Sequence, residues 1–334
     1  MARHPREVLL GSQAGAVTLP ACDHYSGVEA RMRKSLALQA QSLAAHGTCL
    51  FDVTLDCEDG APVGGEAEHA ALVTELLRGL DPQAPLRQRV GARVHPVGHP
   101  AFDADVAQIV GQAADRLAYL MLPKVESVAD IERAVAAVDA AGGAHLPLHG
   151  LIESPLAVHR AFDIAAHPRI ESLSFGLMDF VSAHGGAIPG DGMGVQGQFS
   201  HPLVLQAKLA LASACHAHGK VPSHCVVTEF RDAAALRQAA GQAARSLGYT
   251  RMWSIHPDQI EPIVAAFMPL AAEIEQAVDI VLAAAAEDWA PIAYRGHLHD
   301  RASVRYFWQV LERAHRTGCA LPPAVAGFFV PAST

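Results

Sequence analysis

Polar residues that could do chemistry recur at the ends of short apolar runs in this 334-residue chain. Glu153 and Asp179 each supply a carboxylate at such a position, and Arg93 supplies a guanidinium. Two carboxylates held close together repel each other, and a hard divalent cation such as Mg²⁺ relieves that repulsion, whereas Zn²⁺ prefers Cys and His ligands. A guanidinium offers a planar fork to a substrate carboxylate or to a developing oxyanion. These residue types predict a site for an anionic, oxygen-rich substrate chelated to a metal.

A regular alternation of elements would bring these residues together. Short apolar, β-branched runs alternate with Ala-rich amphipathic stretches from about residue 16 to residue 260, which predicts a parallel sheet. The predicted strands cover residues 16–20, 49–56, 90–95, 118–123, 147–153, 172–178, 221–228 and 250–255. Eight such units close a barrel, so the predicted fold class is α/β, a (β/α)₈ TIM barrel with additional C-terminal helices. Active sites of this fold lie at the carboxyl ends of the strands, where the polar residues fall.

The pattern predicts two domains. Residues 1–265 form the predicted catalytic barrel, and residues 266–334 form a C-terminal helical extension with helices at about 269–288 and 301–316. This extension is long enough to reach a neighbouring subunit, so we expect it at a subunit interface of a homo-oligomer. The Gly-rich segment 185–197 is a candidate lid over the site.

Composition excludes several classes of partner. The chain has 25 Lys+Arg against 34 Asp+Glu, a net charge of −9, which argues against nucleic acid and anionic membranes. Its six cysteines form no C-x-x-C pair, which is typical of reduced core residues. No signal peptide or membrane-spanning segment is recognisable, so we predict a cytoplasmic location.

Two local patterns resemble functional motifs, but we interpret both of them differently. Residues 192–197 match the dinucleotide pattern G-x-G-x-x-G, but they do not directly follow a predicted strand, so we assign them to the lid. Lys124 ends the fourth predicted strand, where some aldolases place a Schiff-base lysine. We prefer the alternative that Lys124 pairs with Glu126 or another carboxylate of the site.

Several longer motifs occur in a fixed order. They are LDCEDGAP (55–62), GARVHP (91–96), LPKVES (122–127), LIESPLA (151–157), HPRIESLSFGLMDF (167–180), LGYTRMWSIHPDQI (247–260) and RGHLHD (295–300). In this order the chain resembles the citrate lyase beta-subunit-like lyases of the HpcH/HpaI aldolase superfamily. The resemblance implies a lyase that cleaves or forms a carbon–carbon bond in a 3-hydroxyacid thioester of the malyl-, citramalyl- or citryl-CoA type. It also implies Mg²⁺ or Mn²⁺ as cofactor, with an oxo acid and an acyl-CoA as small-molecule partners.

The resemblance implies roles for residues of the barrel. Glu153 and Asp179 match the metal ligands of the family. Arg93 matches a catalytic arginine that binds the oxo-acid side of the substrate. His95 and Lys124 lie beside these motifs and are further substrate-binding candidates.

Three more acidic residues receive roles in the same way. Glu58 and Asp59 match an acidic pair next to the metal site and are counted with the catalytic residues. Asp300 matches an aspartate that, in malyl-CoA lyases, reaches a neighbour's active site and handles the proton on the thioester carbon. A trimer or hexamer is the expected assembly.

Two departures from the family leave alternatives open. The family's Arg-x-Asn is Arg93-Val-His95 here, and residues 19–25 stand where the family has its Pro-Gly-x-x-x-x-Lys/Arg arrangement for the coenzyme. One alternative is therefore a metal-dependent aldolase that acts on free hydroxy-oxo acids without CoA. Another is a barrel retained as a non-catalytic binding protein.

Overall fold

The computed structural model describes residues 4–11 and 18–329, which form two compact units. One unit spans Val17–Ala266, and the other combines Met1–Ala16 with Phe267–Thr334. Helix α1 (Pro5–Leu10) therefore belongs with the C-terminal helices, which corrects the prediction that residues 1–265 form one domain. The reason is that Leu9 and Leu10 are buried in the hydrophobic core of the C-terminal unit.

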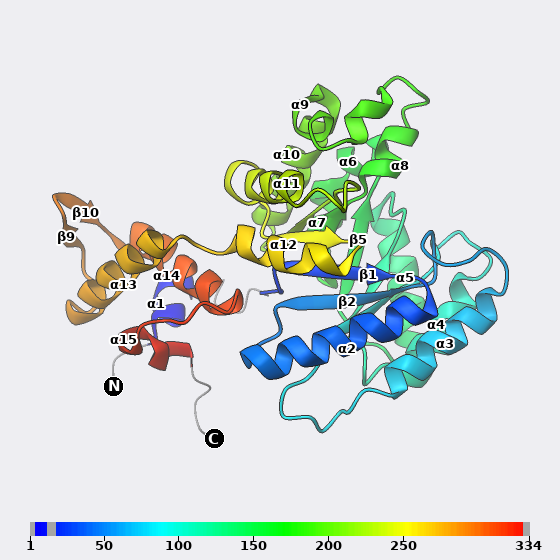
Figure 1. Ribbon diagram of the computed structural model, residues 1–334, viewed down its shortest axis with the longest axis horizontal. Coiled ribbons are helices and arrows are strands. Elements are labelled where there is room, and N and C mark those ends of the chain that lie inside the picture. The colour runs from blue at the N-terminus through cyan, green and yellow to red at the C-terminus, as the bar shows by residue number, and fades with distance from the viewer. Residues whose placement is uncertain (1–3, 12–17, 330–334) are drawn as a thin grey trace. The chain divides into compact units, whose positions relative to one another are not determined.

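Eight parallel strands form a closed barrel in chain order, and β1 pairs with β8 to complete it (Figure 1). The strands are β1 (Cys22–Ser26), β2 (Phe51–Asp56), β3 (Val90–Arg93), β4 (Tyr119–Leu122), β5 (Leu148–Ile152), β6 (Ile170–Phe175), β7 (Val221–His224) and β8 (Arg251–Ser254). The main helices around them are α2 (Glu29–His46), α3 (Glu66–Arg78), α4 (Phe102–Ala113), α5 (Val128–Ala140), α6 (Pro155–His159), α7 (Ala161–Ala166), α10 (Pro202–Ala217), α11 (Ala233–Ser246) and α12 (Ile260–Phe267). The predicted (β/α)₈ barrel is confirmed.

The first strand lies later in the chain than predicted. Residues 16 and 17 of the predicted strand 16–20 lie outside the described residues, and residues 18–20 are not part of a strand. The strand is instead β1, whose Asp23 points into the barrel and pairs with Arg251 at 3.0 Å. The sequence of β1 is Cys-Asp-His-Tyr-Ser, which contains no run of apolar residues, so a search for such runs places the strand on the apolar residues just before it.

A buried ion cluster lies inside the barrel. Arg251 is fully buried and contacts both Asp23 and Asp52, the latter at 2.8 Å. Arg89 also pairs with Asp52, at 3.0 Å. Buried charges of this kind are tolerated only when they are paired, so the cluster holds β1, β2 and β8 in register.

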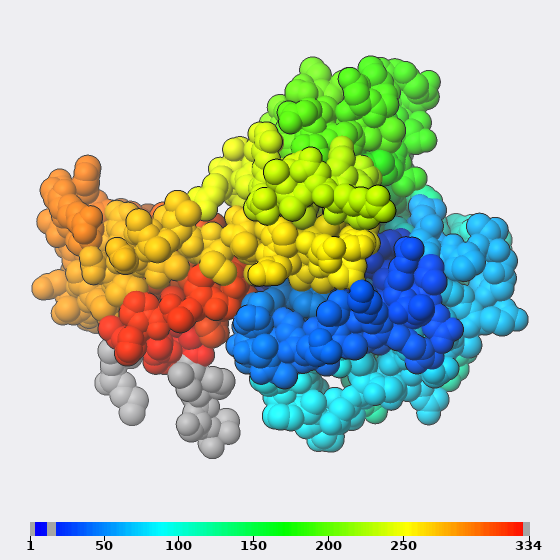
Figure 2. Space-filling model, viewed as in Figure 1, coloured from blue at the N-terminus to red at the C-terminus, as the bar shows by residue number. Residues whose placement is uncertain are grey.

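The segment between β6 and α10 contains three short helices, α8 (Leu177–Ser182), the 3₁₀ turn Gly190–Met193 and α9 (Gly197–Ser200). Of these, only the 3₁₀ turn lies wholly within the predicted lid, residues 185–197. Figure 2 shows this green segment projecting from the rest of the barrel unit. The backbone N–H of Val195 donates to Glu229 Oε1 at 3.1 Å, which fixes the segment to the loop after β7. Its function as a lid stays a prediction.

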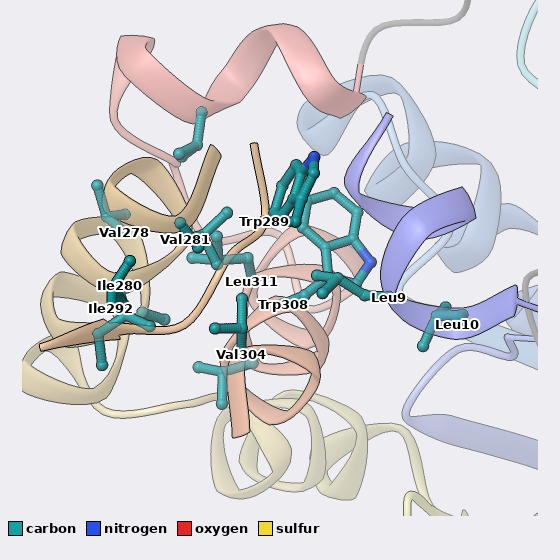
Figure 3. Close-up of a cluster of buried hydrophobic side chains, with 14 residues drawn as sticks. Leu9, Leu10, Val278, Ile280, Val281, Trp289, Ile292, Val304, Trp308 and Leu311 are labelled. Carbon is teal, nitrogen blue, oxygen red and sulfur yellow. The ribbon is translucent and has the colours of Figure 1, made fainter. Parts of the chain in front are cut away.

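The C-terminal unit has its own core. It contains α13 (Ala271–Ala286), the hairpin β9 (Ile292–Tyr294) and β10 (His297–His299), α14 (Arg301–Arg316) and α15 (Pro323–Ala326). Figure 3 shows the apolar side chains of this core gathered around Trp308, with Leu9 of α1 among them. None of the helices in residues 4–11 and 18–329 combines the length and apolar character that crossing a membrane requires.

Candidate active site

Glu153 and Asp179 lie at the carboxyl ends of neighbouring strands. Glu153 directly follows β5, and Asp179 lies in the first turn of α8, just after β6. The Glu153 side chain is 5% exposed, and burial together with repulsion from Asp179 raises its pKa to about 8. The charge of Asp179 therefore acts on the Glu153 carboxylate.

These two carboxylates fit a hard divalent cation. Oε1 of Glu153 accepts a hydrogen bond from the backbone N–H of Lys124 at 2.6 Å, whereas its Oε2 has no partner among residues 18–329. The Asp179 carboxylate makes no hydrogen bond or ion pair within the same residues. Mg²⁺ usually keeps several waters and takes only one or two protein carboxylates. Glu153 and Asp179 would therefore suffice as its protein ligands, although no cluster of three or more His, Cys, Asp or Glu suited to a metal occurs in the described part of the chain.

The backbone around Glu153 is shaped to receive its side chain. A Cβ added at Gly176 would lie 2.4 Å from Glu153 Oε2, so any larger residue would displace the carboxylate. Lys124 has a φ of 51°, an uncommon conformation for a residue other than glycine. This conformation presents its N–H to Glu153, and such strained residues cluster at functional sites.

Arg93, at the end of β3, is held by two carboxylates. Its Nε and Nη2 donate to Asp56 at 2.6 and 3.0 Å, and its Nη1 lies 3.0 Å from Glu58 Oε2. Burial lowers the pKa of Arg93 to about 10, and attraction to Glu153 and Asp179 opposes this effect. The guanidinium therefore lies within electrostatic reach of the candidate metal ligands.

Lys124 faces the predicted acidic pair. Its ammonium lies 2.5 Å from Glu58 Oε1 and 3.4 Å from Asp59 Oδ2. The expected ion pair of Lys124 is thus formed with the carboxylates after β2 and not with Glu126. Burial lowers the pKa of Lys124, but the hydrogen bond and charge of Glu58 and the charge of Asp59 outweigh this and raise it.

Lys124 is therefore expected to form no Schiff base. A lysine kept protonated by carboxylates is a poor amine nucleophile. Borohydride treatment in the presence of pyruvate or glyoxylate should leave the mass of the protein unchanged, while a chelator should inhibit turnover. An adduct mapped to Lys124 by mass spectrometry would reverse this assignment.

His95 is held away from these groups. Its Nδ1 lies 2.6 Å from Asp105 Oδ2 on α4, and its ring stacks on His99 with centroids 4.3 Å apart. No hydrogen bond or ion pair in the described residues connects His95 with Arg93. Its substrate contact stays a prediction.

Asp300 belongs to the C-terminal unit, where it caps a helix. Its carboxylate accepts a hydrogen bond from the backbone N–H of Ser303 at 3.0 Å, at the start of α14. This cap is a sufficient structural reason for an aspartate at this position. Its role in a neighbouring site stays a prediction.

Asp56 and Tyr25 were missed as site residues by the sequence interpretation. The Tyr25 hydroxyl donates to Asp56 Oδ2 and accepts from Arg93 Nη2. Asp56 opens the acidic motif after β2, which was a usable signal, whereas Tyr25 lies on the misplaced strand β1. A glycine is required beside them, because a Cβ at Gly60 would lie 2.4 Å from Asp56 Oδ2.

A basic pocket of about 440 Å³ adjoins this cluster. Tyr25 and Gly60 lie in its wall, and Arg31 and Lys34 of α2 contribute two positive charges. No Asp or Glu lines the pocket, and neither basic residue forms an ion pair within the described ranges. The pocket therefore suits an anionic part of a ligand.

Known proteins resemble this chain in sequence. A family model described as HpcH/HpaI aldolase/citrate lyase matches residues 37–257. An L-malyl-CoA/beta-methylmalyl-CoA lyase of Cereibacter sphaeroides is 30% identical over 281 residues, which cover 78% of this chain and 86% of that protein.

Solved structures share the fold. The crystal structure of a citrate lyase from Burkholderia xenovorans LB400 has 49% sequence identity and a TM-score of 0.82, covering 98% of this chain and 100% of that one. The protein CitE from Mycobacterium tuberculosis, in complex with magnesium, acetoacetate and coenzyme A, has 22% identity and a TM-score of 0.67. That match covers 89% of this chain and 99% of the other.

Proposed function

The chain belongs to the HpcH/HpaI aldolase/citrate lyase family, and from this premise we propose that it is a Mg²⁺-dependent lyase of 3-hydroxyacyl-CoA thioesters. Its substrate is of the malyl-, citramalyl- or citryl-CoA type, and the products are an acyl-CoA and an oxo acid. We also propose that the protein forms a homo-oligomer, either a trimer or a hexamer, and that it is located in the cytoplasm.

The observation that carries the proposal is the basic pocket whose wall includes Tyr25, a hydrogen-bond partner of Arg93. Tyr25 and Gly60 belong both to the pocket wall and to the group of residues around Asp56. A ligand that spans the two places carries a carbonyl or carboxylate at one end and negative charges at the other. An acyl-CoA has this form, because its phosphates lie at the far end from its thioester.

Each group of the site has a distinct proposed role. Arg93 binds the oxo-acid oxygen and stabilises the carbonyl as the carbon–carbon bond breaks. Asp56 and Glu58 orient Arg93 through the bonds at 2.6 and 3.0 Å described above. Lys124 balances the charge of Glu58 and Asp59 and directs its backbone N–H to Glu153.

Glu153 and Asp179 would hold the metal. When bound, Mg²⁺ supplies Lewis-acid polarisation and a template for the substrate oxygens. The family resemblance gives Asp300 of a neighbouring subunit as the residue beside the thioester carbon, and it remains one candidate for the proton transfer.

The alternative of a CoA-independent aldolase rests on the missing Pro-Gly-x-x-x-x-Lys/Arg arrangement. Residues 19–25 lack this arrangement, but β1 ends at Ser26, and the basic residues Arg31 and Lys34 follow it on α2. Arg31 and Lys34 supply positive charge for the phosphates of CoA, so the pocket favours the CoA-dependent lyase.

The direct test is turnover. The protein is incubated with Mg²⁺ and malyl-CoA, citramalyl-CoA or citryl-CoA, and acetyl-CoA and the released oxo acid are quantified. Cleavage of free hydroxy-oxo acids alone would favour the aldolase. Metal binding without turnover of either class would favour the binding protein.

Removing the charges of the pocket should weaken CoA binding selectively. The double variant Arg31→Ala/Lys34→Ala is expected to raise KM for the CoA thioester about tenfold, because two attractions to phosphate are lost. KM for the corresponding pantetheine thioester, which lacks the nucleotide phosphates, should not change. Arg33→Ala is the matched control, since Arg33 lies on the same helix but pairs with Glu29 and Glu75. Equal effects on both thioesters would contradict the assignment.

A further inference from the structure

A buried lysine lies beside a buried cysteine, away from the candidate active site. Lys208 lies in the middle of α10 and is 0% exposed, and Cys225 directly follows β7 and is 1% exposed. Lys208 Nζ donates to Gln198 Oε1 at 2.8 Å, and Cys225 Sγ donates to the same oxygen at 3.2 Å. Neither side chain has a described contact with Glu153 or Asp179. The amine and the thiol therefore lie next to each other on one amide oxygen of α9.

Lys208 has no carboxylate partner within the described residues. Its other neighbours are the ring of Phe199, whose centroid lies 4.3 Å from Nζ, and the Cys225 thiol. Burial lowers the pKa of Lys208, and Cys225 opposes this effect. A buried lysine without a carboxylate loses its proton easily, and the neutral amine is a nucleophile. In this respect Lys208 differs from Lys124, which carboxylates keep protonated.

The lysine can also activate the thiol. Burial raises the pKa of Cys225, whereas the charge of Lys208 and its hydrogen bond lower it. An amine and a thiol in contact have the same composition as an ammonium and a thiolate, and the thiolate is the form that reacts. Lys208 therefore supplies, inside the site, the base that Cys225 needs.

Two unpartnered polar atoms belong to residues that contact this pair. Gln198 Nε2 and His224 Nε2 are buried and have no hydrogen-bond partner in the described part of the chain. The Nδ1 of His224 lies 3.8 Å from Cys225 Sγ, and its ring stacks on Phe199. Buried polar atoms of this kind suit a small molecule that makes hydrogen bonds. Hydrogen peroxide is small and uncharged, whereas burial excludes bulky thiol reagents.

We propose that Lys208 and Cys225 form a covalent N–S bond, a sulfenamide, when the protein meets hydrogen peroxide. The Cys225 sulfur attacks one peroxide oxygen, the O–O bond breaks, and the other oxygen leaves as water with the thiol proton. The Lys208 amine then attacks the sulfur of the sulfenic acid, the S–O bond breaks, and the hydroxyl leaves as water with one amine proton. Sulfur loses two electrons and peroxide gains them. The inference does not depend on the proposed lyase function.

The N–S bond changes how α9 is held. The linked nitrogen is neutral and the sulfur has no proton, so Gln198 Oε1 loses a charged donor and a thiol donor. We expect amide hydrogen exchange of residues 197–201 to become about tenfold faster after oxidation. Unchanged exchange in the linked protein would contradict this consequence.

Mass spectrometry of the full-length protein tests the linkage. After treatment with hydrogen peroxide, the mass should fall by about 2 Da, and a peptide of α10 should be joined to the peptide that contains Cys225. A thiol reductant should restore the original mass. Lys208→Arg keeps a cation for Gln198 but has no neutral amine, and Cys225→Ser has no thiol, so neither variant should form the joined peptide.

A second cysteine and lysine provide the matched control. Cys215 is also buried, and the charge of Lys220 acts on it. Lys220 Nζ, however, donates to the backbone carbonyls of Ile170 and His167, at 2.6 and 3.2 Å. Cys215→Ser should therefore retain the mass loss, which also distinguishes the N–S bond from a disulfide between Cys215 and Cys225.

Three results would overturn the inference. A mass loss that disappears in Cys215→Ser would indicate a disulfide. A mass gain of about 32 Da on Cys225 without a joined peptide would indicate a sulfinic acid. An unmodified Cys225 at peroxide concentrations that oxidise free cysteine would show that the site is closed to peroxide. None of these measurements requires turnover, so their failure leaves the proposed lyase function unaffected.

Discussion

Glu153→Gln is expected to weaken Mg²⁺ or Mn²⁺ binding by more than about 100-fold and to abolish turnover. Glutamine keeps an oxygen for the N–H of Lys124 but removes the negative charge that a hard cation requires. Asp179→Asn should have the same effect, because its charge acts on the same point as that of Glu153. Calorimetric titration with Mn²⁺ measures the affinity, and circular dichroism checks that the fold is retained.

Glu171→Gln is a suitable control for this loss of charge. Glu171 lies in β6, where its carboxylate contacts His149 at 2.8 Å and has no described contact with Glu153 or Asp179. Metal affinity should therefore be unchanged in Glu171→Gln. Unchanged affinity in both Glu153→Gln and Asp179→Asn would remove the metal site from the proposal.

Arg93→Lys is expected to lower kcat/KM about 10²- to 10³-fold while the metal remains bound. Lysine cannot reproduce the fork that contacts Asp56 twice and Glu58 once. The two buried carboxylates are then underpaired, so the variant should also be less stable, by up to about 3 kcal/mol. Steady-state kinetics and denaturant unfolding measure the two effects separately.

A variant of the nearby Arg89 distinguishes an effect on catalysis from an effect on stability. Arg89 immediately precedes β3 and pairs with Asp52 in the buried ion cluster, at the opposite end of the strand from Arg93. Arg89→Lys should lower stability but leave kcat/KM near the wild-type value. Equal kinetic losses in Arg89→Lys and Arg93→Lys would indicate a general effect on the barrel and contradict a specific role for Arg93.

The sequence predicted strands β2 to β8 because each lies in a stretch that contains apolar residues and follows a helix at regular spacing. It failed for β1 because Asp23, His24 and Ser26 leave this strand without an apolar run, and its partners Arg251 and Arg93 lie far along the chain. Such pairings depend on barrel closure, which a local pattern does not report.

The candidate site was predictable to a similar degree. The positions of Glu153 just after β5 and of Asp179 just after β6 were predictable, because each residue ends an apolar run. That both Asp56 and Glu58 pair with Arg93 was not predictable. This pairing depends on the loop from Asp56 to Gly60, in which the N–H of Gly60 donates to Asp56 Oδ2 at 2.6 Å.

The buried Arg251 also determines when, during synthesis on the ribosome, the barrel can be completed. Arg251 is the only cation that pairs with Asp23 in the described part of the chain, and the two residues are separated by nearly the whole barrel. A nascent chain that ends before residue 251 would have to bury the Asp23 charge without a counter-ion, which is costly. We therefore expect the barrel to stay open at β1 until β8 has left the ribosome. Chains truncated before β8 are expected to be captured by chaperones or degraded and not to accumulate as a partial barrel.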